Sequence, residues 1–433
     1  MNAINDFWIW GKKILLNDVN DFSTNQKSTE ANPMQFIPRE KKEQIKQISS
    51  TKSRTIFLYK NGKAIGYLNG TNQFFKETRF PKIKKISFSD SHEGILTEEK
   101  IFFAKGRRSR NYHLYDFTNF SEFIEDPNDR IIEDIVSGLD AIYCLTSNGN
   151  AYGFGSNYRS QLGITRKKLP ELNQPILMMK NVSKIFTGDN SKYVFLLNSN
   201  QELFGCGENK YGQLGLGFEK EFIPLTQNKK IPKGKIIDIK TGKVHSVMLI
   251  QDYDQNQNPK RKLYSCGHFQ VNGLGKKIMH ASLFTEIKSS LFEKDNIIEI
   301  SVGNNHTLIL TSKGKLLGFG GNNLGQLGNE NMKNVPVPIQ IELPKLRFNE
   351  DISNYHIYCS GFTSFLYFSF NSSLNEDLLK LFQRKEFCDI SFKTENGEII
   401  EAHKLILKYR LNQIEKLQEI ISNKINKRIE SNI

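Results

Sequence analysis

The sequence predicts an all-β protein, a seven-bladed β-propeller whose ring is closed by strands from the N- and C-terminal ends of the propeller region. Three observations predict this fold class. A glycine-rich turn recurs along the chain, an apolar strand precedes each copy, and the two incomplete units stand at opposite ends of the repeated region. Short antiparallel units cannot bury their faces alone, so they must stack on their neighbours, either in a line or in a ring.

The glycine-rich turn is clearest between Leu203 and Gly215, in the run LFGCGENKYGQLG. Similar copies lie at Ala151 to Gly163 and at Leu316 to Gly328, and a degenerate copy lies at Leu263 to Gly275. Equivalent glycines of the four copies are Gly155, Gly207, Gly267 and Gly320, which gives intervals of 52, 60 and 53 residues. Tight turns between strands need glycine at positive φ, and no copy completes the Gly-x-Gly-x-x-Gly pattern of a phosphate-binding loop. We therefore interpret these glycines as structural turn residues.

An apolar strand precedes each turn and carries a glycine at a constant position. These glycines are Gly138, Gly188, Gly242 and Gly303. Two of the four strands continue as Gly-x-x-His, with histidines at His245 and His306. Neither histidine has a cysteine or carboxylate at the spacing of metal ligands, and a ring would hold the two apart. We expect both to hydrogen-bond to backbone groups between blades.

The ends of the repeated region favour a ring over an open stack. The last apolar strand, Tyr358 to Phe370, has no glycine-rich partner after it, whereas Phe7 to Lys12 resembles a partner that lacks its own first strand. Pairing the two would complete a unit and remove exposed sheet edges. Two degenerate units fit between them, at Ile45 to Gly70 and at Ile83 to Gly106, which brings the count to seven.

The turn Gly-x-Gly-x-Asn-x-x-Gly-Gln-Leu-Gly, alternating with Gly-x-x-His-Thr strands, resembles the regulator of chromosome condensation repeat family. The resemblance covers residues 130 to 370 most specifically. It implies a seven-bladed propeller closed by strands from both termini. It also implies a candidate activity, because the founding member of that family promotes nucleotide exchange on the small GTPase Ran.

The pattern changes after residue 370. We expect a propeller over residues 1–370, a linker over 371–375 and a small α/β segment over 376–433. In that segment, Phe387 to Phe392 predicts a strand, Asn396-Gly397 a hairpin turn, and Ala402 to Leu407 the start of a helix. This order resembles the first part of a BTB/POZ domain, and the chain stops before the remaining helices of that domain. The resemblance implies self-association and contact with a cullin-type ubiquitin ligase scaffold.

Composition points to a folded intracellular protein. The chain has 433 residues, 38% of them hydrophobic, and its N-terminal apolar run is too short for a signal peptide or a membrane span. The five cysteines form no Cys-x-x-Cys pair; they are Cys144, Cys206, Cys266, Cys359 and Cys388. We therefore expect a reducing compartment, the cytoplasm first and the nucleus as the alternative. No catalytic constellation and no metal or cofactor motif is present, so we expect a protein that is not an enzyme.

The net charge of +14 predicts candidate partner-binding residues. One basic cluster contains Lys105, Arg107, Arg108 and Arg110, and another contains Lys260, Arg261 and Lys262. Such clusters attract nucleic acid, acidic protein surfaces or anionic lipid. The alternative interpretation is that they are solvated loops in a lysine-rich chain, and no recognition-helix pattern accompanies them. A protein partner is favoured over nucleic acid, and no membrane contact is expected.

Three functional hypotheses follow. The first is a protein-interaction adaptor in which the propeller holds a target and the BTB/POZ-like segment supports self-association or a cullin-type scaffold. The second is guanine-nucleotide exchange on, or regulation of, a small GTPase, with the insertion Gln251 to Lys262 as the wedge. The third is binding to chromatin or nucleic acid. The sequence leaves the target and the oligomeric state open.

Overall fold

The computed structural model separates the chain into two compact units, Met1–Ser369 and Phe370–Ile433. The structure describes residues 7–11, 28–33, 45–51, 53–68, 74–77, 80, 82–109, 112–165, 171–253, 257–268, 270–275, 280–329, 332–342, 355–368, 390–393 and 399–402. Within these residues the only helical elements are two short 3₁₀ turns, η1 (Ser121–Phe123) and η2 (Pro127–Asp129). All other regular elements are β-strands, so the all-β prediction is confirmed for the first unit.

Six blades of four consecutive antiparallel strands make up most of the first unit. Blade 1 comprises β3 (Ile45–Ser50), β4 (Arg54–Tyr59), β5 (Ala64–Leu68) and β6 (Phe74–Glu77). Blade 2 comprises β7 (Ile83–Phe88), β8 (His92–Thr97), β9 (Phe102–Ser109) and β10 (Tyr112–Asn119). Blade 3 comprises β11 (Ile132–Ser137), β12 (Ala141–Thr146), β13 (Ala151–Ser156) and β14 (Glu171–Met179). Blade 4 comprises β15 (Val182–Phe186), β16 (Tyr193–Asn198), β17 (Leu203–Asn209) and β18 (Lys220–Gln227). Blade 5 comprises β19 (Lys235–Thr241), β20 (His245–Tyr253), β21 (Pro259–His268) and β22 (His280–Glu286). Blade 6 comprises β23 (Ile297–Val302), β24 (His306–Thr311), β25 (Leu316–Gly320) and β26 (Val335–Ile341).

The remaining four strands form a composite sheet, which we call the closing sheet. Its strand order is β2-β1-β28-β27, from β1 (Phe7–Gly11), β2 (Ser28–Pro33), β27 (Tyr355–Ser360) and β28 (Thr363–Phe368). β1 pairs antiparallel with β28, as the sequence predicts for the two ends of the repeated region. Six of the seven units counted in the sequence are thus continuous blades, and the seventh four-stranded sheet is assembled from both ends.

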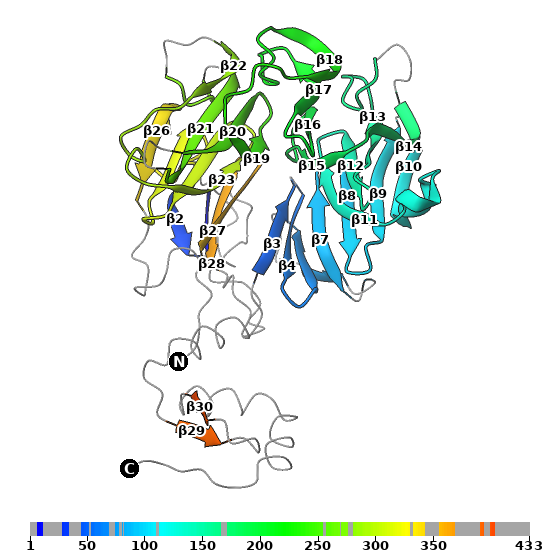
Figure 1. Cartoon of the computed structure of the whole chain (residues 1–433), viewed down its shortest axis with the longest axis horizontal. Helices are drawn as coiled ribbons and strands as arrows, with labels where there is room; N and C mark the ends of the chain where they lie inside the picture. The colour runs from blue at the N-terminus through cyan, green and yellow to red at the C-terminus, as the bar shows by residue number, and fades with distance from the viewer. Residues whose placement is uncertain are drawn as a thin grey trace, which may run out of the picture. The chain divides into compact units, whose positions relative to one another are not determined.

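The first strand of each blade lies toward the centre of the ring, and the last strands β10, β14, β18, β22 and β26 lie outside (Figure 1). The central strands share the pattern apolar-x-x-apolar, as in Ile83 to Ile86 and Ile132 to Ile135. In blades 1 to 6 a β-bulge falls at the same point of this pattern. The repeated bulge increases local twist and turns the polar pair toward the next blade.

The apolar core fills the spaces between neighbouring blades. The second strands β12, β16 and β24 are buried along their whole length, because both faces of each strand contact another blade. Between blades 4 and 5, for example, Phe195 of β16 packs on Phe284 of β22 with ring centroids 6.0 Å apart. Burial on both faces explains why these strands are near-continuous apolar runs in the sequence.

The turn glycines adopt the backbone conformation that the sequence predicts. At Gly207 φ is +111°, and Gly155, Gly267 and Gly320 lie between +102° and +110°. A Cβ at Gly207 would also lie 2.5 Å from the carbonyl oxygen of Lys192. Glycine is therefore required at this position both by φ and by the close approach of the neighbouring strand.

The second set of glycines has a different physical reason, which is space for the histidine. A Cβ at Gly303 would lie 2.3 Å from Cε1 of His306, so the imidazole packs directly on the glycine backbone. Nε2 of His306 is 2.9 Å from Oγ of Ser364 in the closing sheet, and Nε2 of His245 is 3.1 Å from Oγ1 of Thr307 in blade 6. The expectation that both histidines link blades is correct, but their partners are side-chain hydroxyls and not backbone groups.

The Gly-Gln-Leu-Gly segment attaches each blade to the next. Oδ1 of Asn209 accepts a hydrogen bond from the amide of Leu214, 2.8 Å away, and Leu214 is fully buried. The amide of Gly217 then donates to the carbonyl of Ser282 in β22 at 2.7 Å. The turn thus reaches across from blade 4 to the outer strand of blade 5.

The predicted units of the N-terminal part begin where expected, at Ile45 and Ile83, and each continues past its predicted end into an outer strand, β6 or β10. In the second unit, β29 (Ile390–Lys393) pairs antiparallel with β30 (Ile399–Ala402), and the predicted turn Asn396-Gly397 between them lies outside the described residues. The predicted linker over 371–375 and both predicted helices lie outside the described residues. The domain boundaries of the sequence analysis therefore remain predictions.

Candidate interaction surface

The first predicted basic cluster lies on β9 in blade 2. Nζ of Lys105 is 5.9 Å from the ring centroid of Phe117 on β10, within reach of a weak cation–π contact. Arg107 and Arg108 also belong to β9, where Arg107 pairs in register with His113. Arg110 lies outside the described residues. Within the described part of this cluster, Lys105 is therefore placed against an aromatic ring of its own blade.

The second predicted cluster is divided by its hairpin. Arg261 donates from one guanidinium nitrogen to the carbonyl of Ile297 at 2.9 Å, at the start of the central strand of blade 6. Nζ of Lys262 lies 2.7 Å from Oδ2 of Asp252, an ion pair within the hairpin itself. Of the three residues, Lys260 is exposed, and Arg261 and Lys262 are half-buried. The cluster thus holds two structural cations, and it does not form a continuous basic surface.

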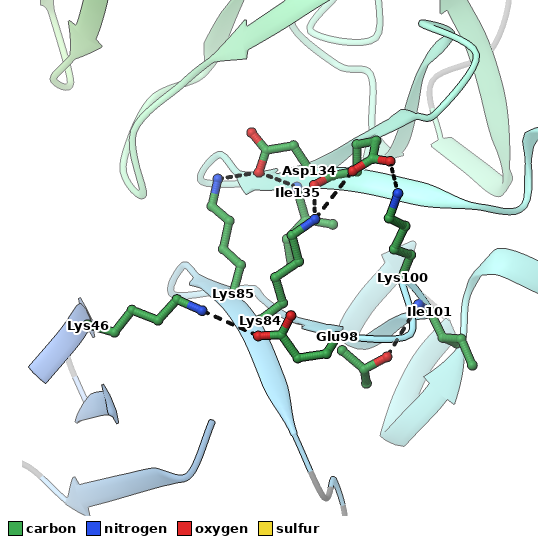
Figure 2. A network of polar contacts seen from close by, with 10 residues as sticks. Lys46, Lys84, Lys85, Glu98, Lys100, Ile101, Asp134 and Ile135 are labelled. Carbon is green, nitrogen blue, oxygen red and sulfur yellow. Dashed lines mark hydrogen bonds and ion pairs between the residues drawn. The ribbon is translucent and has the colours of Figure 1, made fainter. Parts of the chain in front are cut away.

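A polar network joins the central strands of blades 1 to 3 (Figure 2). Lys85 lies 2.5 Å from Asp134, and Lys46 lies 3.5 Å from Glu98. Glu133 accepts from both Lys84 and Lys100, and the hydrogen bond from Lys100 is the main reason why the pKa of Glu133 is lowered. These lysines are matched by carboxylates, so the network fastens blades together and leaves little net charge for a partner.

One contact crosses the centre of the ring. Asp189, in the loop between β15 and β16 of blade 4, meets Oγ of Ser360 at the end of β27 in the closing sheet. The hydroxyl of Ser360 also lies 2.6 Å from the carbonyl of Ser50 in blade 1. Burial, with a smaller contribution from the nearby Asp90, raises the pKa of Asp189 to about 7. Three sheets therefore meet at one hydroxyl group.

An unpaired basic surface follows β18, in the connection between blades 4 and 5. Lys229, Lys230, Lys233 and Lys235 are all exposed, and within the described part of the chain none of them forms an ion pair. Four lysines in seven residues without an acidic residue are visible in the sequence. The sequence analysis missed them because it selected clusters that contain arginine.

Exposed apolar side chains adjoin these lysines. Phe218 has 45% of its surface exposed and Leu283 has 39%. Gly217, the residue before Phe218, lies between Lys230 and Leu283, since a Cβ added there would be 2.9 Å from Nζ of Lys230 and 3.1 Å from Cδ2 of Leu283. Leu283 lies on β22, where it forms an isolated bridge with Leu216, and β18 and β22 both lie at the top of the view in Figure 1. We call the four lysines with Phe218 and Leu283 the Lys229 surface.

The described residues contain no group of three or more His, Cys, Asp or Glu side chains that would hold a metal ion. The four described cysteines are buried, and burial raises the pKa of Cys144 and of Cys359 to about 12, which disfavours the reactive thiolate. None of the helices in the described part of the chain has the length and apolar character needed to cross a membrane.

Comparisons with known proteins agree with this geometry. The family model described as regulator of chromosome condensation (RCC1) repeat matches residues 200–249 and 313–365, and a second RCC1 repeat model matches 297–326. The chain thus carries RCC1 repeats. Neither of these two models matches residues 376–433, so the BTB/POZ resemblance of that segment remains a prediction.

Similar curated proteins are larger than the matched region. Serine/threonine-protein kinase Nek9 of Mus musculus is 29% identical over 277 residues, which is 58% of this chain and 27% of Nek9. Ultraviolet-B receptor UVR8 of Arabidopsis thaliana is 25% identical, over 49% of this chain and 46% of UVR8. Protein RCC2 of Mus musculus is 25% identical, over 49% and 44%. The chain spans between about a quarter and a half of the length of these relatives.

Solved structures show the fold. Prp20p of Saccharomyces cerevisiae superposes with a TM-score of 0.69 at 18% identity, covering 86% of this chain and 93% of that chain. Human WBSCR16 gives a TM-score of 0.63 at 14% identity, covering 85% and 100%. The first unit is therefore an RCC1-like β-propeller.

Proposed function

We propose that the protein is a non-enzymatic interaction module whose propeller holds a partner protein through loops at its surface. The observation that carries this proposal is the use of the repeat motif. Its glycines, asparagines and histidines form structural contacts between or within blades, as at Gly207, Asn209 and His306. What remains for recognition is the set of loops that differ from blade to blade.

Relatives support a protein partner. The structure of Prp20p was described together with its binding to Gsp1p and histones, and another structure contains yeast RCC1 (Prp20) bound to Kap60. RCC1-like propellers are thus used by other proteins as protein-binding rings. For this chain, a partner with acidic character fits better than a basic one, because its net charge is +14.

The experiment is chemical cross-linking of the purified full-length chain in native cell extract, followed by mass spectrometry of the linked peptides. We expect a partner to be linked reproducibly to the loops of the first unit, and the link to be lost when unlabelled protein is added in excess. Cross-links that do not saturate would refute the proposal. The same partner added in purified form must bind the chain with defined stoichiometry.

Regulation of a small GTPase is a second candidate, favoured by the extended hairpin of β20 and β21. Tyr253, at the end of β20, is 59% exposed, so this hairpin presents an aromatic side chain to a partner. Release of labelled GDP from a panel of small GTPases tests this function directly. An unchanged release rate with equimolar full-length protein excludes exchange activity, and deletion of residues 254–258 must abolish any acceleration.

The cullin-type adaptor hypothesis depends on residues 376–433, of which the structure describes the hairpin of β29 and β30. Its test is a comparison of partners captured by the full chain and by residues 1–370. Loss of cullin components on removal of the C-terminal unit supports the adaptor. Equal capture by both proteins refutes it.

A further inference from the structure

We propose that the Lys229 surface binds an acidic segment of a partner protein that also carries a large apolar side chain. The lysines would pair with its carboxylates, and Phe218 with Leu283 would contact the apolar side chain. This inference rests on the proposed function, because it names the chemistry of the partner that the propeller holds.

Charge is the first argument. Lys229, Lys230, Lys233 and Lys235 lie within seven residues and are exposed, and within the described residues no carboxylate pairs with any of them. Elsewhere on this propeller, lysines on strands, such as Lys85 of β7 and Lys262 of β21, are matched by aspartates at 2.5 and 2.7 Å. An unmatched group of four like charges destabilises the free protein, and an acidic ligand removes that cost.

The second argument is that the connection is held in place before any ligand binds. Asn228 is 3% exposed, and its side-chain amide donates to the carbonyls of Leu214 at 3.2 Å and Gly215 at 3.0 Å. Its Oδ1 accepts from the amide of Lys230 at 3.0 Å. The backbone at Lys229 and Lys230 is therefore held by hydrogen bonds in the free protein, which lowers the entropic cost of binding there.

The third argument concerns the apolar neighbours. Monomeric surfaces expose single apolar side chains commonly, but here Leu283 lies at Gly217 beside the ammonium group of Lys230, and the exposed Phe218 is the next residue along the chain. An aromatic anchor beside a basic rim is the composition of a protein-binding site. A surface of lysines alone would lack the apolar contact that gives such a site its specificity.

Two acidic residues beside Phe218 argue against nucleic acid as the ligand of this surface. Glu219 and Glu221 are exposed directly after Phe218. Their carboxylates would repel a phosphate backbone that continues from the lysines along β18. A peptide tolerates this mixture because it can place a neutral or basic residue opposite the two glutamates, whereas a regular phosphate chain cannot.

The test measures binding of a defined peptide to the full-length chain by fluorescence anisotropy. The probe is a labelled 12-residue peptide of Glu and Ser with one central Phe, and its matched form has Ser in place of Phe. The test variant is Lys229→Glu/Lys230→Glu/Lys233→Glu. The control variant Lys82→Glu/Lys180→Glu/Lys333→Glu makes the same change in net charge at three exposed lysines of other connections.

We expect the test variant to weaken peptide binding at least tenfold and the control variant to change it less than twofold. Phe218→Ser should weaken binding of the Phe peptide about fivefold and leave the Ser peptide unaffected. Equal weakening by the two charge variants would show non-specific attraction and overturn the inference. Absence of measurable binding by the unmodified chain overturns it as well.

A 20-base-pair DNA duplex is the competing probe. If the duplex binds the chain more tightly than the peptide and loses affinity with the same three lysines, nucleic acid is the occupant and the inference is wrong. The proposed function is tested separately, by the cross-linking experiment. Saturable partner binding that survives the test variant therefore leaves the interaction module intact while it refutes the role of the Lys229 surface.

Discussion

Replacing Asp189 by asparagine tests the contact that crosses the ring. Oγ of Ser360 touches two acceptors, the carbonyl of Ser50 and Oδ2 of Asp189, but a hydroxyl group carries a single proton. If Ser360 donates to Ser50, the proton between Ser360 and Asp189 must come from the carboxyl group. Asp189 is then neutral in the folded protein. Asparagine supplies an N–H donor in the same place without a carboxylate that can ionise.

The magnitude follows from the pKa of Asp189, which burial raises to about 7. In the unfolded chain an aspartate ionises near about 3.9. Between these values the unfolded state loses its proton and the folded state keeps it, so the free energy of unfolding falls as pH rises. Above pH 7 both states are ionised and the loss is complete. Between pH 5 and pH 8 the expected loss is about 2.5 kcal/mol, at about 1.36 kcal/mol per pKa unit.

The two buried histidines contribute with the opposite sign. Burial lowers the pKa of His245 and of His306 to about 3, so stability from these groups is lost as pH falls below about 6.5. The free energy of unfolding of the unmodified protein therefore varies with pH as the sum of the effects of Asp189 and of the two histidines. The difference between Asp189→Asn and the unmodified protein at each pH cancels the histidines and isolates Asp189.

The assay is urea denaturation at pH 5 and at pH 8, with the midpoint and slope fitted at each pH. We expect Asp189→Asn to gain about 2.5 kcal/mol relative to the unmodified protein between the two conditions. Asp90→Asn is the control, because it removes the neighbouring charge and should reduce the pH dependence without abolishing it. A difference that stays constant within about 0.5 kcal/mol from pH 5 to pH 8 would refute the neutral carboxyl.

Three further predictions follow from single contacts. Gly207→Ala should lower stability by about 2 kcal/mol or more, because φ is +111° and the new Cβ would meet the Lys192 carbonyl; an unchanged urea midpoint contradicts this. In proton NMR, the imidazole C2–H signals of His245 and His306 should not shift between pH 8 and pH 5, and a midpoint near 6.5 for either would show that it is accessible to solvent. Arg261→Met should cost about 1 to 3 kcal/mol through the lost bonds to blade 6 and change binding of the acidic peptide less than twofold. A tenfold loss of affinity would instead place Arg261 in the binding site.

The parts of the fold that the sequence predicts are those with a local cause. Gly207 marks a turn because only glycine fits its φ, and Ile83 to Ile86 marks a central strand because its apolar spacing recurs. The outer strands were not predicted. β18, for example, reads Lys220 to Gln227 with only Ile223 buried and no regular alternation, because it lies at a sheet edge. Its position is set by the neighbouring strand and not by its own pattern.

The candidate site was predicted less well because charge in sequence does not specify pairing in space. Arg261 and Lys262 are adjacent, yet successive side chains of a strand point to opposite faces. One therefore meets the carbonyl of Ile297, 36 residues away, and the other meets Asp252 across the hairpin. A basic run on a strand is divided in this way between two faces. Lys229, Lys230 and Lys233 escape the division because they lie in the connection between β18 and β19.

The repeat itself provides a way to separate structure from function. A feature that recurs from blade to blade serves the joint between blades, as the glycines and buried asparagines of blades 3 to 6 do. The position after the repeated glycine is Leu139 in blade 3, Lys243 in blade 5 and Asn304 in blade 6, but Asp189 in blade 4. The connection that follows blade 4 also carries the Lys229 surface. Asp189 is buried in a contact between sheets, whereas the exposed lysines of the Lys229 surface take no part in a joint between blades, so we infer that a partner contacts the connection after blade 4.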